Sequence, residues 1–216
     1  MSEVNLLRSL PTSKRNLKAR ESAKTQEHIR ISREYGQEYF DGPREYGYGG
    51  YRYDGRWKPV AKDIIDHFKL NKGDRVLDIG CAKGFLVKDL LDLGIDAYGV
   101  DVSEYALQNC MPETVGRLHL CSAEDICFPK DSFAAVLSIN TLHNLDKVLI
   151  KKALKKIEFI SSGKAFVQVD SYNSDEQKKL FESWVLTARY HDFPDKWLQL
   201  FKEAGYTGDY YWTVIG

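Results

Sequence analysis

The chain contains 216 residues, of which 43% are hydrophobic, so it is long enough to enclose one sizeable core. Its 31 basic and 31 acidic residues cancel, which gives no electrostatic case for a nucleic-acid or anionic-membrane partner. No apolar run approaches the ~20 residues of a membrane span, and no apolar signal core follows the first charges. The four cysteines have no zinc or redox spacing, which is typical of free thiols in a reducing compartment. We therefore expect a soluble, cytoplasmic protein.

Residues 1–56 are predicted to form an N-terminal extension that ends in a lid. Residues 1–27 are polar and basic, and their cluster of Lys and Arg is interpreted as a solvated surface. Residues 46–57 are rich in Tyr and Gly; large rings are costly to leave in water, and the glycines permit sharp turns. We therefore expect a mobile loop over a ligand site. The predicted substrate contacts in this loop are Tyr46, Tyr48, Tyr51, Arg52 and Arg56.

A strand, a glycine loop and a helix follow a predicted helix at residues 57–70. Residues 75–79 form a mainly apolar run, Gly80 and Gly84 bracket a tight turn, and residues 85–93 have the pattern of a short helix. This succession is typical of the nucleoside-binding unit of α/β proteins.

Two carboxylates flank the glycine loop. A second short strand, at residues 97–100, leads directly to Asp101, where an acid can hold ribose hydroxyls because ligands lie beyond the carboxyl ends of the strands. Asp78 stands at the loop entrance, where it repels a diphosphate and suits a cationic or amino-bearing ligand. Val87 occupies the place of the third glycine of a dinucleotide fingerprint. S-adenosylmethionine has the character that this site requires.

The rest of the chain continues the alternation of strands and helices. Further strands are predicted near residues 118, 133–139, 163–169 and 209–215. Residues 197–204 have the pattern of an amphipathic helix capped by Gly205, and residues 184–190 are a candidate for one more strand. The predicted fold is α/β, Rossmann-like and doubly wound, with a mostly parallel sheet of six or seven strands and helices on both faces.

The segment Asp78-Ile-Gly-Cys-Ala-Lys-Gly84 is close to the pattern D-x-G-x-G-x-G, with alanine in place of the middle glycine. With this motif, and with residues 121–128 and 140–145 as third and fourth motifs, the sequence resembles the class I S-adenosylmethionine-dependent methyltransferases. The resemblance implies a methyltransferase domain over residues 57–216 with S-adenosylmethionine as its cofactor. The cofactor-binding residues that it implies are Asp78, Gly80, Cys81, Ala82, Gly84, Asp101, Val102, Ser122, Ala123, Glu124 and Asn140.

Two histidines are candidates for a general base in such an enzyme. His143 follows the fourth predicted strand and can titrate near neutral pH; His191 is the second candidate. Asp170, Tyr172 and Tyr190 are predicted to contact the substrate. No metal is expected, because the ends of the two inner strands offer a hard cation only one carboxylate.

The Tyr/Gly segment resembles small bacterial methyltransferases associated with sugar and surface-polysaccharide, or capsule, biosynthesis. This resemblance implies a small-molecule acceptor and O-methylation of a sugar, nucleotide-sugar or phosphorylated precursor. N-methylation of an amino sugar and a non-catalytic S-adenosylmethionine-binding regulatory subunit stay open as alternatives. Residues 139–142 lack the proline and ring of nucleic-acid amino methyltransferases. The sequence does not indicate the oligomeric state.

Overall fold

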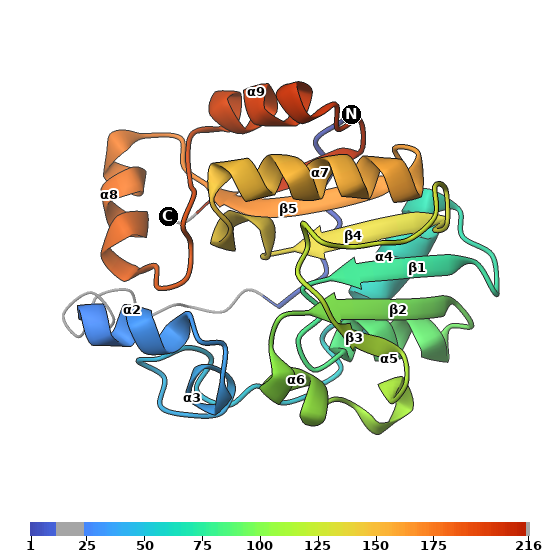
Figure 1. Ribbon diagram of the computed structural model, residues 1–216, viewed down its shortest axis with the longest axis horizontal. Coiled ribbons are helices and arrows are strands. Elements are labelled where there is room, and N and C mark those ends of the chain that lie inside the picture. The colour runs from blue at the N-terminus through green and yellow to red at the C-terminus, as the bar shows by residue number, and fades with distance from the viewer. Residues whose placement is uncertain (12–23, 215–216) are drawn as a thin grey trace.

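The computed structural model describes residues 1–11 and 24–214, and a single sheet lies at its centre (Figure 1). The strands run parallel to their neighbours in the order β3-β2-β1-β4-β5-β6. In chain order they are β1 (Arg75–Ile79), β2 (Asp96–Asp101), β3 (Leu118–Leu120), β4 (Ala135–Ile139), β5 (Ala165–Ser171) and β6 (Asp209–Val214). The order reverses between β1 and β4, and this reversal opens a crevice beyond their carboxyl ends. The predicted α/β fold class is confirmed, with six strands in the described part of the chain.

Helices cover both faces of the sheet because alternate residues of each buried strand point to opposite sides. The helices are α2 (Gln26–Ser32), α3 (Gln37–Phe40), α4 (Lys58–Phe68), α5 (Phe85–Asp92), α6 (Glu104–Gln108), α7 (Lys147–Ser161), α8 (Asp175–Trp184) and α9 (Pro194–Ala204). Two short 3-10 turns are η1 (Pro112–Thr114) and η2 (Leu142–Asn144). In β1, Val76 belongs to the core with α4 and α5, whereas Leu77 belongs to the core with α7 and α9. Residues 185–193 are irregular, so the strand predicted at residues 184–190 is wrong.

The first residues of the chain line the outer edge of β6. Tyr210 N–H donates to the Ser2 carbonyl oxygen at 3.0 Å, and Val4 N–H donates to the Tyr210 carbonyl oxygen at 2.9 Å. Leu6 is buried in the core beside α4. These residues therefore complete the sheet, although they precede the boundary predicted at residue 56. Of the predicted basic cluster, Lys14, Arg15, Lys18 and Arg20 lie outside the described residues.

Residues 24–57, here called the covering segment, cross the end of the sheet with α2 and α3 (Figure 1). Several polar contacts hold this segment to the rest of the protein, and three of them show its span. Ser103 Oγ donates to the Tyr35 carbonyl oxygen at 2.6 Å, Lys83 Nζ lies 2.5 Å from Asp41 Oδ2, and Arg33 Nη2 donates to the Ala188 carbonyl oxygen at 3.0 Å. The segment thus reaches both halves of the sheet.

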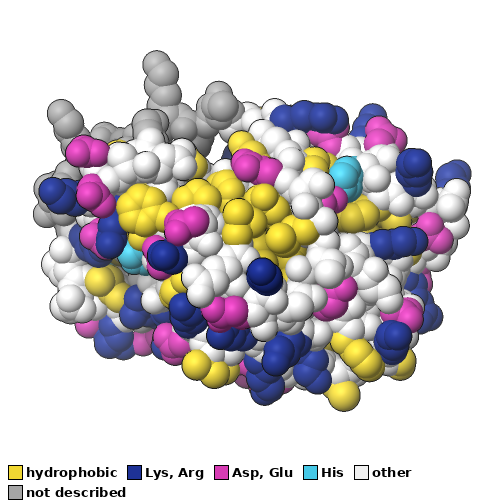
Figure 2. Space-filling model, turned by 90° about the horizontal axis from the view of Figure 1, so that it is seen from above, with side chains coloured by type: hydrophobic (Ala, Val, Ile, Leu, Met, Phe, Trp, Pro, Cys, Tyr) yellow, Lys and Arg dark blue, Asp and Glu magenta, His cyan; other side chains and the backbone are white. Residues whose placement is uncertain are grey.

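The face seen from above α9 carries interspersed acidic and basic side chains around a hydrophobic area (Figure 2). This mixture agrees with the zero net charge of the sequence. Among the described residues, no helix is long and apolar enough to cross a membrane.

Candidate functional site

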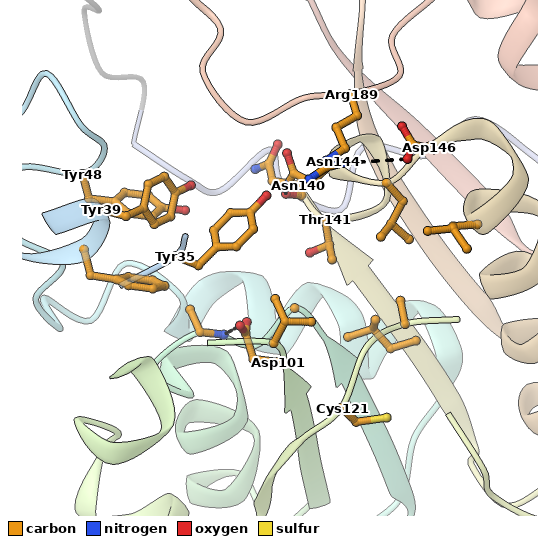
Figure 3. Close-up of a pocket in the computed structure, with 18 residues that line it drawn as sticks. Tyr35, Tyr39, Tyr48, Asp101, Cys121, Asn140, Thr141, Asn144, Asp146 and Arg189 are labelled. Carbon is orange, nitrogen blue, oxygen red and sulfur yellow. Dashed lines mark hydrogen bonds and ion pairs between the residues drawn. The ribbon is translucent and has the colours of Figure 1, made fainter. Parts of the chain in front are cut away.

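A cavity of about 280 Å³ lies at the carboxyl ends of β1, β2 and β4, beneath the covering segment (Figure 3). Its lining residues are Tyr35, Tyr39, Phe40, Tyr48, Ile79, Gly80, Ala82, Asp101, Val102, Cys121, Ala123, Asn140, Thr141, Asn144, Leu145, Asp146, Leu149 and Arg189. Tyr35, Tyr39 and Tyr48 reach toward Asn140 and Asn144, while Asp101 lies on the sheet side. The cavity therefore has one wall from the sheet and one aromatic wall from the N-terminal part of the chain.

The glycine loop depends on left-handed backbone at its turn. Gly80 has φ 82° and Gly84 has φ 74°, and a Cβ at Gly80 would lie 2.7 Å from Thr141 Cβ. Asp101 fixes the loop, since its Oδ2 accepts the Ala82 N–H at 2.7 Å and its Oδ1 accepts the Ser103 N–H at 2.8 Å. Each carboxylate oxygen has a further lone pair, which suits the two hydroxyls of a ribose. Gly84 itself does not line the cavity but starts α5.

The alanine of the loop motif has a packing partner. Ala82 adopts φ 49° and is buried in a cluster with Phe40 of the covering segment and Ala106 of α6. A glycine would offer no methyl group to this cluster. The departure from the family pattern thus coincides with the contact between the loop and the aromatic wall.

A smaller cavity of about 80 Å³ adjoins the other side of the loop and includes Asp78. Its lining residues are Tyr48, Tyr51, Trp57, Asp78, Gly80, Cys81, Ala82, Leu86, Ile139, Asn140 and Thr141. Burial, reinforced by the negative charge of Asp101, raises the pKa of Asp78 to about 7. Two carboxylates in one poorly solvated place favour a cation between or beside them. The amino group and sulfonium of S-adenosylmethionine therefore fit the residues present.

We expect the affinity for S-adenosylhomocysteine, which keeps the amino group, to fall about tenfold as the pH is lowered from 7.5 to 5.5. Asp78 of the free protein takes up a proton below its pKa of about 7, and only the charged carboxylate attracts the ammonium. Calorimetry at constant ionic strength measures this effect. In Asp78→Asn the affinity should be lower at pH 7.5 and nearly flat over the same range. An equally steep pH profile in this variant would contradict the role of Asp78.

The third motif contributes only part of its predicted residues. Ala123 and Val102 line the larger cavity, and with Leu145 and Leu149 they supply apolar surface suited to a flat base. Ser122 and Glu124 are not in the wall. Ser122 Oγ donates to Asp125 Oδ2 at 3.1 Å, and Glu124 Oε2 is buried without a hydrogen-bond partner among the described residues.

Neither predicted base is among the lining residues. His143 is buried, its Nδ1 accepts the Asp170 N–H at 3.2 Å, and its Nε2 lies 3.8 Å from Asp170 Oδ2. Burial lowers the pKa of His143, although the charge of Asp170 opposes this shift. His191 Nδ1 lies 3.2 Å from the Tyr172 hydroxyl, and its ring contacts Phe181. Both imidazoles are thus engaged in packing and hydrogen bonds behind the cavity.

Only two of the predicted substrate residues line a cavity. Tyr48 lines both cavities and Tyr51 lines the smaller one. The structure does not bring Tyr46, Arg52, Arg56, Asp170, Tyr172 or Tyr190 into either wall. The Tyr46 ring packs on His28, the Arg56 side chain binds its neighbour Asp54, and the Tyr190 ring packs on Trp197.

Several lining residues were missed by the sequence analysis. Among them are Tyr35, Tyr39, Phe40, Asn144, Asp146 and Arg189. Asn144 follows the fourth strand within the motif that drew attention to His143, and Arg189 lies two residues before His191. A signal was therefore present in each case, but which side chain of a short irregular segment faces the ligand is decided by tertiary packing.

Comparison with known proteins gives one family and a set of structures of the same fold. Residues 77–160 match the model of a family described as a methyltransferase domain. No curated protein matches the chain. A methyltransferase solved in complex with the Haloferax volcanii Trm112 methyltransferase activator has 21% identity and a TM-score of 0.54, over 67% of this chain and 66% of that chain. A methyltransferase from an antibiotic biosynthesis pathway of Anabaena variabilis has 21% identity and a TM-score of 0.51, over 67% and 60%.

A third structure matches a larger share of this chain. Phosphoethanolamine N-methyltransferase 2 of Haemonchus contortus, in complex with phosphomonomethylethanolamine and S-adenosylhomocysteine, has 19% identity and a TM-score of 0.57. The match includes 81% of this chain but only 44% of that one. The chain thus spans 60 to 66% of the first two structures and less than half of this third one. At such identities the likeness shows the fold, and the match to the methyltransferase-domain family is confined to residues 77–160.

Proposed function

We propose that this chain, whose residues 77–160 match a family of methyltransferase domains, is a class I methyltransferase that transfers the methyl group of S-adenosylmethionine to a small polar acceptor. The observation that carries the proposal is that Asp101 and the glycine loop face the tyrosines of the covering segment across one cavity. When bound, the cofactor supplies a methyl group that its sulfonium already activates. The protein then has to bind, align and shield the reactants.

Each part of the cavity has a proposed task. Asp101 holds the ribose, Val102 and Ala123 contact the adenine, and Asp78 attracts the amino group. The covering segment closes the opposite side, where Tyr35 and Tyr48 exclude water and contact the acceptor. Aromatic rings stack on the apolar faces of sugars, and tyrosine hydroxyls bond to sugar hydroxyls. These features support a sugar or nucleotide-sugar as the acceptor of an O-methyl transfer.

A hydroxyl oxygen and an amine nitrogen differ in whether the protein has to remove a proton during methyl transfer. Among the described lining residues of the larger cavity there is no imidazole, and the carboxylates are Asp101, which binds the loop, and Asp146. Burial raises the pKa of Tyr35 to about 12, so its phenol is protonated at neutral pH and is not a base. For a hydroxyl acceptor we propose Asp146 as the proton acceptor. The shortage of bases favours N-methylation as the second candidate, because an amine can arrive deprotonated.

We expect His143→Asn to retain turnover within about tenfold of the wild type. The Asn Oδ1 can accept the Asp170 N–H as Nδ1 does, so the local packing is kept. Loss of a general base would instead lower turnover by about 10²- to 10⁴-fold. The measurement is kcat with the identified acceptor, beside the melting temperature. A loss of this larger size in a folded variant would restore His143 to the role of base.

The proposed function is tested by binding and turnover together. S-adenosylhomocysteine should bind more tightly than NAD in calorimetry, since the loop lacks the features of a pyrophosphate site. Incubation with labelled S-adenosylmethionine and a panel of sugar phosphates, nucleotide-sugars and amino sugars should yield a labelled product. Preference for NAD would contradict the assignment. Tight cofactor binding without transfer to any member of the panel would favour the non-catalytic alternative.

A further inference from the structure

The acceptor end of the larger cavity contains a single basic side chain. Of the described lining residues, Arg189 alone carries a positive charge, while Tyr35, Asn144 and Asp146 lie around it (Figure 3). Arg52 and Arg56, the two arginines predicted to contact the substrate, are not in the wall. Arg189 is therefore the described lining residue that can bind an anion.

The backbone of Arg189 is fixed while its guanidinium is not. The N–H groups of Arg189 and Tyr190 both donate to the His143 carbonyl oxygen, at 2.9 and 3.1 Å. The guanidinium donates no hydrogen bond to any described residue; its nearest anionic neighbour, Asp146 Oδ2, lies 3.8 Å from Nη1. Both side chains of this pair are about half exposed, so the pair contributes little stability. An anchored arginine with free donors is available to a ligand.

The surroundings reinforce the positive character of this end. Arg33 of the covering segment donates to the Ala188 carbonyl oxygen, which belongs to the peptide group preceding Arg189. The Nε of Arg33 is buried and has no hydrogen-bond partner among the described residues. The charges of both arginines lower the pKa of the Tyr35 hydroxyl, against the larger effect of burial. Asn144 Oδ1 is also buried without a described partner, and it can accept a hydrogen bond from an acceptor hydroxyl or amine.

We propose that the acceptor carries an oxyanion, a phosphate or a carboxylate, which Arg189 binds in the cavity while Asn144 binds a neighbouring hydroxyl or amine. The planar guanidinium presents paired donors that match two oxygens of such a group, and the bond is charge-assisted. The oxyanion replaces Asp146 as the partner of Arg189 and leaves that carboxylate free. This inference rests on the proposed function, because it names the class of molecule that the same cavity methylates.

The test uses the full-length protein saturated with S-adenosylhomocysteine and titrates it with inorganic phosphate, and separately with acetate, at constant ionic strength. Side-chain Nε–H NMR signals report on each arginine. We expect a saturable shift of the Arg189 signal in the wild type. The dissociation constant, measured by calorimetry for every variant, should be at least tenfold weaker in Arg189→Gln. Arg56→Gln, a matched loss of charge on the covering segment, should leave the constant unchanged. The ion that binds with the lower dissociation constant identifies the oxyanion as a phosphate or a carboxylate.

Several outcomes would overturn the inference. One is that neither ion shifts the Arg189 signal; another is that Arg189→Gln binds the ion with the dissociation constant of the wild type, which places binding elsewhere. If Arg189→Gln does not fold, Arg189→Lys keeps the charge without the planar donor pair and should bind at least threefold more weakly than wild type. The same samples separate this inference from the proposed function. Failure to bind S-adenosylhomocysteine contradicts the function, whereas cofactor binding without a saturable shift contradicts only the anion site.

Discussion

Asp101→Ala is expected to weaken the binding of S-adenosylhomocysteine about 100-fold. A hydrogen bond to a charged group contributes roughly 1.5–3 kcal/mol, and the carboxylate is placed to make such bonds with the ribose. The same side chain accepts the Ala82 and Ser103 N–H groups, so its removal also loosens the loop that carries the ligand. Calorimetry with the purified variant measures the change in affinity.

The same strand offers a matched control. Asp96 is the first residue of β2 and Asp101 is the last. The Asp96 carboxylate pairs with Arg117 at the opposite end of the strand from Asp101. Asp96→Ala should therefore leave the affinity for S-adenosylhomocysteine unchanged. A second readout is the pKa of Asp78, which should fall in Asp101→Ala because the neighbouring negative charge is gone. Equal affinities in the two alanine variants would contradict the assignment of Asp101.

The sheet and its loop could be predicted because they follow from local patterns. Apolar strands, a turn that needs left-handed backbone and an acid at a strand end each leave a mark within a few residues. Gly80 and Asp101 therefore lie where the sequence analysis expected them. The edge of the sheet could not be predicted in this way, because Ser2 and Val4 meet Tyr210 from the other end of the chain.

The acceptor side of the cavity depends on packing between distant segments. The place of His143 after the fourth strand predicted it at the reacting centre, but the turn η2 points its ring toward the Asp170 backbone. Asn144, the next residue, lines the cavity instead. Likewise the predicted lid began at Tyr46, whereas the rings of Tyr35 and Tyr39 also face the ligand side. One step along an irregular segment changes the direction of a side chain, and composition does not determine that step.

Gly80→Ala should both destabilise the protein and abolish most cofactor binding. At φ 82° an alanine has a strained backbone, which costs roughly 1–2 kcal/mol. Its Cβ would also lie 2.6 Å from Thr141 Cγ2 and 2.7 Å from Thr141 Cβ, and relieving such overpacking costs about 1–3 kcal/mol more. Because Thr141 and Gly80 line both cavities, the displacement reaches the ligand itself. We expect S-adenosylhomocysteine affinity to fall at least ~30-fold, in line with about 2 kcal/mol of added strain.

Gly116→Ala separates the two causes of that loss. Gly116 has φ 79°, close to the value at Gly80, but a Cβ there would meet nothing within 4 Å. This variant should show the backbone cost of roughly 1–2 kcal/mol in urea unfolding and bind S-adenosylhomocysteine like the wild type. The difference between the two unfolding free energies then measures the contact with Thr141. Equal stability and equal affinity in both variants would mean that Gly80 serves only the turn, and that the close approach of β1 and β4 at this point does not shape the site.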